Sequence, residues 1–108
     1  MNENRIALLR QMEASDPNDP FIPYAIAQEY LGGGLNEEAE AALSELLKRF
    51  PDYVPAYQHL GAICLQLGWL EKAKSALEKG IKMAQEQGNK KAAGEMTTLM
   101  EEVEDQLD

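Results

Sequence analysis

The feature that most constrains this chain is an internal repeat of 34 residues. When the sequence is aligned with itself at that offset, identities gather at one turn and at small positions of the stretch that follows. The six pairs are Leu31 with Leu65, Gly34 with Gly68, Glu37 with Glu71, Ala39 with Ala73, Ala42 with Ala76, and Leu43 with Leu77. A period of this length is typical of stacked supersecondary units that bury apolar faces against their neighbours.

Each copy contains two helical patterns. In the first copy, residues 18–51, Asp19-Pro20 predicts a helix start, because proline tolerates the first turn. Gly32-Gly33-Gly34 predicts its end. Asn36 is expected to cap a second helix, which carries acidic residues in its first turn and stops at Phe50-Pro51.

The second copy, residues 52–87, repeats this plan. Asp52 is expected to cap its first helix, with Pro55 in the first turn and Gly68 at the end. A second helix is predicted to begin near Leu70 and to break at Gly88-Asn89.

Amphipathic segments flank the two copies. Residues 1–16 are expected to form an N-terminal helix with Ile6, Leu9 and Met12 facing inward. Residues 89–108 are expected to form a C-terminal capping helix. Its inward residues are predicted to be Ala92, Met96, Leu99, Met100, Val103 and Leu107. The 108 residues are therefore predicted to form a single all-α domain of antiparallel helical hairpins.

The repeats resemble the tetratricopeptide repeat family. The second copy reads Tyr57-x2-Leu60-Gly61-x2-Cys64 and then Ala73-x3-Leu77. The first reads Pro23-x2-Ile26-Ala27-x2-Tyr30, then Ala39-x3-Leu43 and Pro51. The resemblance implies about two repeats, with a helix at each end, stacked as a short right-handed solenoid.

Two positions depart from the family pattern. Pro23 stands where a large aromatic is usual, which suggests a late or irregular start of that helix. Gln85 stands where the closing proline is usual, so the helix there is expected to run further.

The sequence offers little material for catalysis or metal binding. His59 and Cys64, the only histidine and the only cysteine, are five residues apart and fall on different faces of a helix. Cys64 is expected to be a small buried hydrophobe. No zinc, calcium or phosphate-loop spacing is present. We therefore expect no enzyme, no cofactor and no metal.

Net charge narrows the class of partner. The formal charge is −9 at pH 7, which disfavours nucleic acid and anionic membranes and favours a basic or neutral protein or peptide. The charge either steers a partner or only keeps the chain in solution. No signal peptide or membrane-spanning run is evident, and a lone cysteine is typical of a reducing setting, so a cytoplasmic location is expected.

The resemblance also implies a binding surface. In this family the first helices of successive repeats line a concave groove that accepts a peptide or a partner helix. The corresponding residues are Tyr24, Gln28, Leu31, Gln58, His59, Ala62, Leu65 and Gln66. They include no Lys, Arg or Asn, so a carboxylate clamp of the chaperone-tail type is not expected. Trp69 lies in a turn and is expected to pack on a neighbouring helix or, if exposed, to contribute to an interface.

Two functions remain open at this point. The first is an adaptor that binds a peptide or partner surface through the groove. The alternative is a structural module that self-associates as a homodimer and has no separate ligand groove. Ordinary solvent exposure also explains each groove residue taken alone. The sequence names neither the partner nor the pathway.

Overall fold

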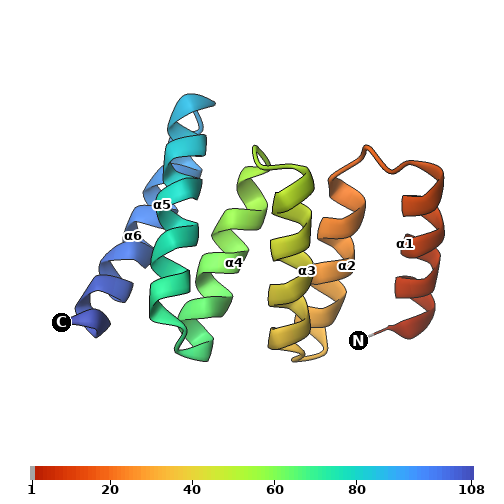
Figure 1. Cartoon of the computed structure of the whole chain (residues 1–108), viewed down its shortest axis with the longest axis horizontal. Coiled ribbons are helices and arrows are strands. Elements are labelled where there is room, and N and C mark those ends of the chain that lie inside the picture. Colours follow the sequence, from red (N-terminus) through yellow and green to blue (C-terminus); the bar gives the residue numbers. More distant parts are fainter. Residues whose placement is uncertain (1) are drawn as a thin grey trace. The chain divides into compact units, whose positions relative to one another are not determined.

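The computed structural model describes residues 2–108, which form six α-helices and no strand (Figure 1). The helices are α1 (Glu3–Ser15), α2 (Phe21–Gly32), α3 (Asn36–Arg49), α4 (Val54–Leu67), α5 (Leu70–Glu86) and α6 (Lys90–Leu107). The predicted all-α class and the order of the six helices are confirmed.

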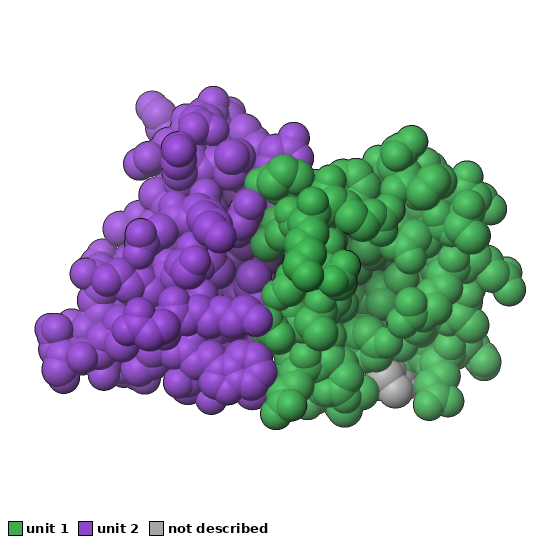
Figure 2. Space-filling view, viewed as in Figure 1, with its two compact units in different colours: residues 1–51 green, residues 52–108 purple. Residues whose placement is uncertain are grey.

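The chain divides into two compact units, residues 1–51 and 52–108 (Figure 2). The first unit holds α1, α2 and α3, and the second holds α4, α5 and α6. The division falls at the boundary between the two sequence repeats. Each unit contains one complete helical hairpin, α2 with α3 or α4 with α5, and one flanking helix.

The hairpin turns explain why the repeat identities include a glycine. Gly34 and Gly68 adopt φ angles of 75° and 78°, in the left-handed region that glycine enters without steric cost. This turn lets the Leu35 N–H bond to the Tyr30 carbonyl at 2.9 Å, and the equivalent bond after α4 measures 2.8 Å. Both hairpins therefore end their first helix with the same glycine motif.

The predicted capping roles of Asn36 and Asp52 are wrong. Leu35 occupies the cap position of α3, because its N–H is bonded back to α2 and holds it at φ −90°, ψ 72°. Asn36 is already the first helical residue. Likewise Tyr53 precedes α4, with ψ 92°, so Asp52 lies one residue too early to cap it.

Pro23 does not delay α2, so the late start, one of the two expectations for this residue, is wrong. The helix begins at Phe21, so Pro23 is its third residue and its missing N–H falls among the first-turn groups that have no helical partner. The Asp19 carboxylate accepts the Phe21 N–H at 3.0 Å. The expectation for Gln85 is confirmed, since α5 has 17 residues and α3 has 14.

Helices α1 and α2 form one cluster of the first unit's core, and α3 adds the buried Leu43 and Leu46. Ile6 and Leu9 from α1 pack with Ile22 and Ile26 from α2. Met12 does not join them, contrary to prediction, and is 46% exposed. It lies three residues beyond Leu9, at the edge of the α1 face that packs on α2.

The core of the second unit depends on close helix approach. Helix α6 packs on both α4 and α5. A Cβ at Gly80 would lie 2.5 Å from Tyr57 Cβ and 2.6 Å from Met96 Sδ, so all three helices meet where α5 has no side chain. On α6, Ala92, Met96, Met100 and Val103 are buried and Leu99 is partly buried, as predicted. Leu107 was predicted to face inward but is 37% exposed, since it is the last residue of the helix.

These contacts predict opposite effects for two glycine-to-alanine changes. Gly80→Ala should destabilise the chain by about 1–3 kcal/mol through overpacking against Tyr57 and Met96. Gly94→Ala should stabilise it by about 0.5–1 kcal/mol, because no atom lies within 4 Å of the added methyl and alanine favours helix. Urea unfolding followed by circular dichroism measures both changes. A stabilising Gly80→Ala would contradict the three-helix contact.

Candidate partner-binding surface

Helix α2 presents the predicted residues of the first unit on one face. Tyr24, Gln28 and Leu31 follow helical steps of four and three residues, and all three are partly exposed. Phe21 extends this face by one turn and is 61% exposed, with its ring centroid 6.4 Å from that of Tyr24. Sequence reasoning missed Phe21, although its three-residue spacing from Tyr24 was a usable signal.

Gln28 has an unusual hydrogen-bonding state. Its Nε2 atom is buried and has no hydrogen-bond partner among residues 2–108. A buried amide donor without a partner typically costs about 1–3 kcal/mol. Such a donor gains a partner if a carbonyl oxygen is brought to it.

Helix α4 presents the predicted residues of the second unit. Gln58, Ala62 and Leu65 are partly exposed and Gln66 is exposed. His59 is partly buried, and this burial lowers the pKa of its imidazole below the usual value. The histidine is therefore neutral at physiological pH and adds no positive charge to α4.

Helix α6 adds residues that the sequence reasoning did not include. The Gln58 amide on α4 donates a hydrogen bond to the Glu95 carboxylate on α6. Leu99 and Glu102 follow Glu95 at steps of four and three residues, so they share that side of α6. The sequence signal for this side of α6 was the recurrence of acidic and apolar residues at steps of four and three.

The structure thus gathers the predicted residues into two sets. Three lie on α2 in the first unit and five lie on α4 in the second unit. The first set is uncharged and has aromatic rings at one end. The second set is bordered by the Glu95 carboxylate of α6. Each set forms a surface on its own unit.

A hollow of about 450 Å³ also lies in the first unit, lined by residues of α1, α2 and α3. Apolar atoms of Pro23, Ile26 and Leu46 contribute to its lining. Charged groups line it as well, and the Arg49 guanidinium lies 3.4 Å from the Glu13 carboxylate. The lining thus carries charged groups of both signs, two arginines and three glutamates.

Trp69, in the turn between α4 and α5, is 38% exposed. The Lys72 Nζ atom lies 5.8 Å from its ring centroid, within cation–π range. The indole is thus partly covered by its own hairpin and still presents a face to solvent.

Chemically reactive groups do not converge on either surface. The Cys64 thiol is buried, and burial, with a smaller effect from Asp52, raises the pKa of Tyr57. Within residues 2–108, no group of three or more His, Cys, Asp or Glu side chains is arranged to hold a metal ion. No helix in that range is long and apolar enough to cross a membrane.

Comparison with known sequences identifies the repeat. The family profile described as Tetratricopeptide repeat matches residues 6–62 and 34–95. A curated relative, the TPR repeat-containing protein PA0015 of Pseudomonas aeruginosa, is 27% identical over 96 residues. That alignment covers 89% of this chain and 91% of the relative.

Solved structures agree with this match. A crystal structure of a tetratricopeptide repeat domain protein from Salinibacter ruber has a TM-score of 0.76 and 36% sequence identity, covering 80% of this chain and 97% of that one. Protein BPP2914 from Bordetella parapertussis, at 21% identity, shares the fold with a TM-score of 0.77, covering 94% of this chain and 88% of that one. The chain therefore belongs to the tetratricopeptide repeat family, whose members generally serve as protein-interaction modules.

Proposed function

We propose that this chain is an adaptor that binds segments of partner proteins through two surfaces, the α2 face of the first unit and the α4 face of the second unit, the latter bordered by α6. The observation that carries the proposal is the α2 face itself. It places Phe21, Tyr24 and Leu31 in solvent on one side of a helix in the first unit. Aromatic side chains of this kind are enriched at the energetically dominant positions of protein interfaces.

Backbone recognition is the second part of the proposal. Side-chain amides are bifunctional, since each provides both donors and an acceptor. On the α4 face the exposed Gln66 amide can meet a main-chain group of a ligand. On the α2 face the partnerless Gln28 donor, which is buried, can meet a main-chain carbonyl when its side chain turns outward. An extended segment, whose backbone groups are unpaired, suits these amides better than a folded helix.

Charge is the third part. Glu95 borders the α4 face through its bond with Gln58, Glu102 lies seven residues further along the same side of α6, and the whole chain carries −9. Carboxylates at the rim of an interface act mainly on association rate and on the choice of partner. We infer a partner segment that is apolar with basic residues nearby, in keeping with the expected basic or neutral partner. A reducing cytoplasm suits the single thiol, and no catalytic step belongs to this function.

Peptide selection tests the adaptor function directly. Peptides of about 16 residues displayed on phage and selected on the full chain should be enriched in basic and apolar residues and depleted in acidic ones. Phe21→Ala should weaken the selected peptides by about 10-fold. Glu102→Lys should weaken basic peptides, whereas the matched change Glu104→Lys, on the opposite side of α6, should have a smaller effect. Isothermal calorimetry provides the affinities.

Two results would contradict this proposal. One is a library that yields no peptide above background. The other is a set of selected peptides whose affinity is unaffected by Phe21→Ala and Glu102→Lys alike.

Gln28 provides a second test, because its unpaired donor should lower the stability of the chain and strengthen peptide binding. Gln28→Met keeps a similar shape and removes the unsatisfied donor, so it should raise the free energy of unfolding by about 1 kcal/mol. The same change should weaken the selected peptides, because a hydrogen bond to the ligand is lost. Thermal unfolding and calorimetry on one preparation give both quantities. Lower stability together with unchanged affinity would show that the Gln28 amide serves the fold instead.

A further inference from the structure

The hollow of the first unit is a surface feature that the adaptor function does not use. Its volume is about 450 Å³, which lies in the range typical of sites for small molecules. Pro23, Ile26 and Tyr30 form its α2 side, at helical steps of three and four residues. None of the predicted binding residues of α2 lines it. The hollow and the proposed α2 face therefore lie on different sides of the same helix.

The repeat register indicates why space remains beside Pro23. Pro23 and Leu46 line the hollow, and their counterparts 34 residues later are Tyr57 and Gly80. In the second unit the tyrosine packs directly over Gly80 and is only 6% exposed. Because proline is the smaller residue, the first unit lacks the aromatic ring that the second unit buries at this position. An aromatic group of a ligand can occupy that space.

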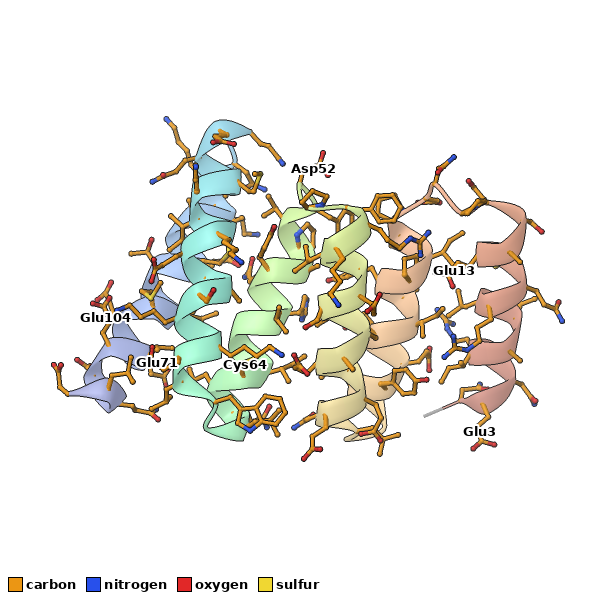
Figure 3. All side chains as sticks on the ribbon, viewed as in Figure 1. Glu3, Glu13, Asp52, Cys64, Glu71 and Glu104 are labelled. Carbon is orange, nitrogen blue, oxygen red and sulfur yellow. The ribbon has the colours of Figure 1, made fainter. Side chains whose placement is uncertain are left out.

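Most of the charged groups that line the hollow are already paired. The Arg49 guanidinium lies 3.4 Å from the carboxylate of Glu13, which is labelled near the end of α1 in Figure 3. The Lys48 Nζ atom lies 3.2 Å from the Glu45 carboxylate. Three of the five lining charges are therefore neutralised within the unit itself.

Arg10 and Glu38 are the lining charges that remain. Within residues 2–108, neither has an oppositely charged group at ion-pair distance. The Arg10 guanidinium donates a hydrogen bond to the Tyr30 hydroxyl at 3.0 Å, which positions it and leaves its other N–H groups available to a ligand. The hollow thus offers one cation from α1 and one anion from α3, together with an apolar lining from α2 and α3.

We propose that the hollow binds a small zwitterion with an apolar body, of the size of a dipeptide that carries an aromatic side chain. The ligand carboxylate bonds to the Arg10 guanidinium, whose planar group suits a carboxylate. The ligand ammonium bonds to the Glu38 carboxylate, and the aromatic ring lies against Pro23, Ile26 and Leu46.

The charge pattern selects this occupant. A ligand with a single charge pairs with Arg10 or with Glu38 and leaves the other without a partner, whereas a zwitterion pairs with both. The site uses none of the residues on the α2 and α4 faces, so it is independent of the adaptor function.

Titration of the full chain with phenylalanyl-leucine, followed by methyl NMR signals, tests the site. The Ile26 and Leu46 methyl signals should shift with a dissociation constant of about 1 mM or tighter, and those of Leu31, on the other side of α2, should not. The N-acetylated and C-amidated forms of this dipeptide each lack one charge. Each should therefore bind at least about 3-fold more weakly.

Substitutions identify the charge that each end of the ligand meets. Arg10→Gln should weaken the free dipeptide by about 3-fold or more and leave the amidated form, which has no carboxylate, unaffected. Glu38→Gln should weaken the free dipeptide similarly and leave the acetylated form unaffected. The matched changes Arg5→Gln and Glu37→Gln remove charges from the same two helices outside the hollow, and they should not alter dipeptide binding.

All four substituted residues are exposed, so the variants should remain folded, which circular dichroism verifies. If one unfolds, the capped dipeptides on the wild type provide the same test. The proposal is overturned by an absence of shifts at about 10 mM dipeptide, by shifts outside the hollow, by a capped form that binds as tightly as the free dipeptide, or by matched controls that weaken binding equally. The peptides selected on phage should bind Arg10→Gln unchanged, which separates a failure of this site from a failure of the adaptor function.

Discussion

The close approach of three helices at Gly80 is the constraint on which the second unit depends. Tyr57 on α4 and Met96 on α6 both reach the place where a side chain on α5 would stand. Because α5 gives up that volume, α6 lies against α4 as well as α5. This placement brings Glu95 to Gln58. The missing side chain at Gly80 therefore contributes to the close packing of the three helices that places Glu95 beside α4.

Much of this arrangement could be predicted from the sequence, because the two repeats carry the same pattern of turn residues and buried residues. The helices, the glycine turns and the buried Cys64 follow from periodicity and local stereochemistry. The wrong predictions concern positions where tertiary packing overrides the preference of the local sequence. Asn36 looked like a cap, but the bond from Leu35 back to α2 shifts the helix start by one residue. Met12 has the spacing of a core residue, yet it lies at the edge of the face that packs on α2 and stays exposed.

The binding surface was less predictable than the fold. Tyr24, Gln28 and Leu31 share one face of α2, and the five predicted residues of the second unit all lie on α4. Phe21 and the α6 residues were missed for a physical reason. Repeat alignment points to positions within repeats, whereas exposure at a helix start and contact between α4 and a flanking helix depend on packing. The α2 and α4 faces differ in chemistry, since the α4 face is bordered by the Glu95 carboxylate and the predicted residues of the α2 face are uncharged.

The central claim is that recognition belongs to the first helices of the repeats and to α6, which lies beside α4. Amide chemical-shift mapping of the full chain, titrated with a soluble peptide that alternates lysine and leucine, tests it most directly. The account predicts shifts concentrated on α2, α4 and α6, with α3 and α5 little changed. Shifts confined to α3 and α5, or no shifts at about 1 mM peptide, would contradict it.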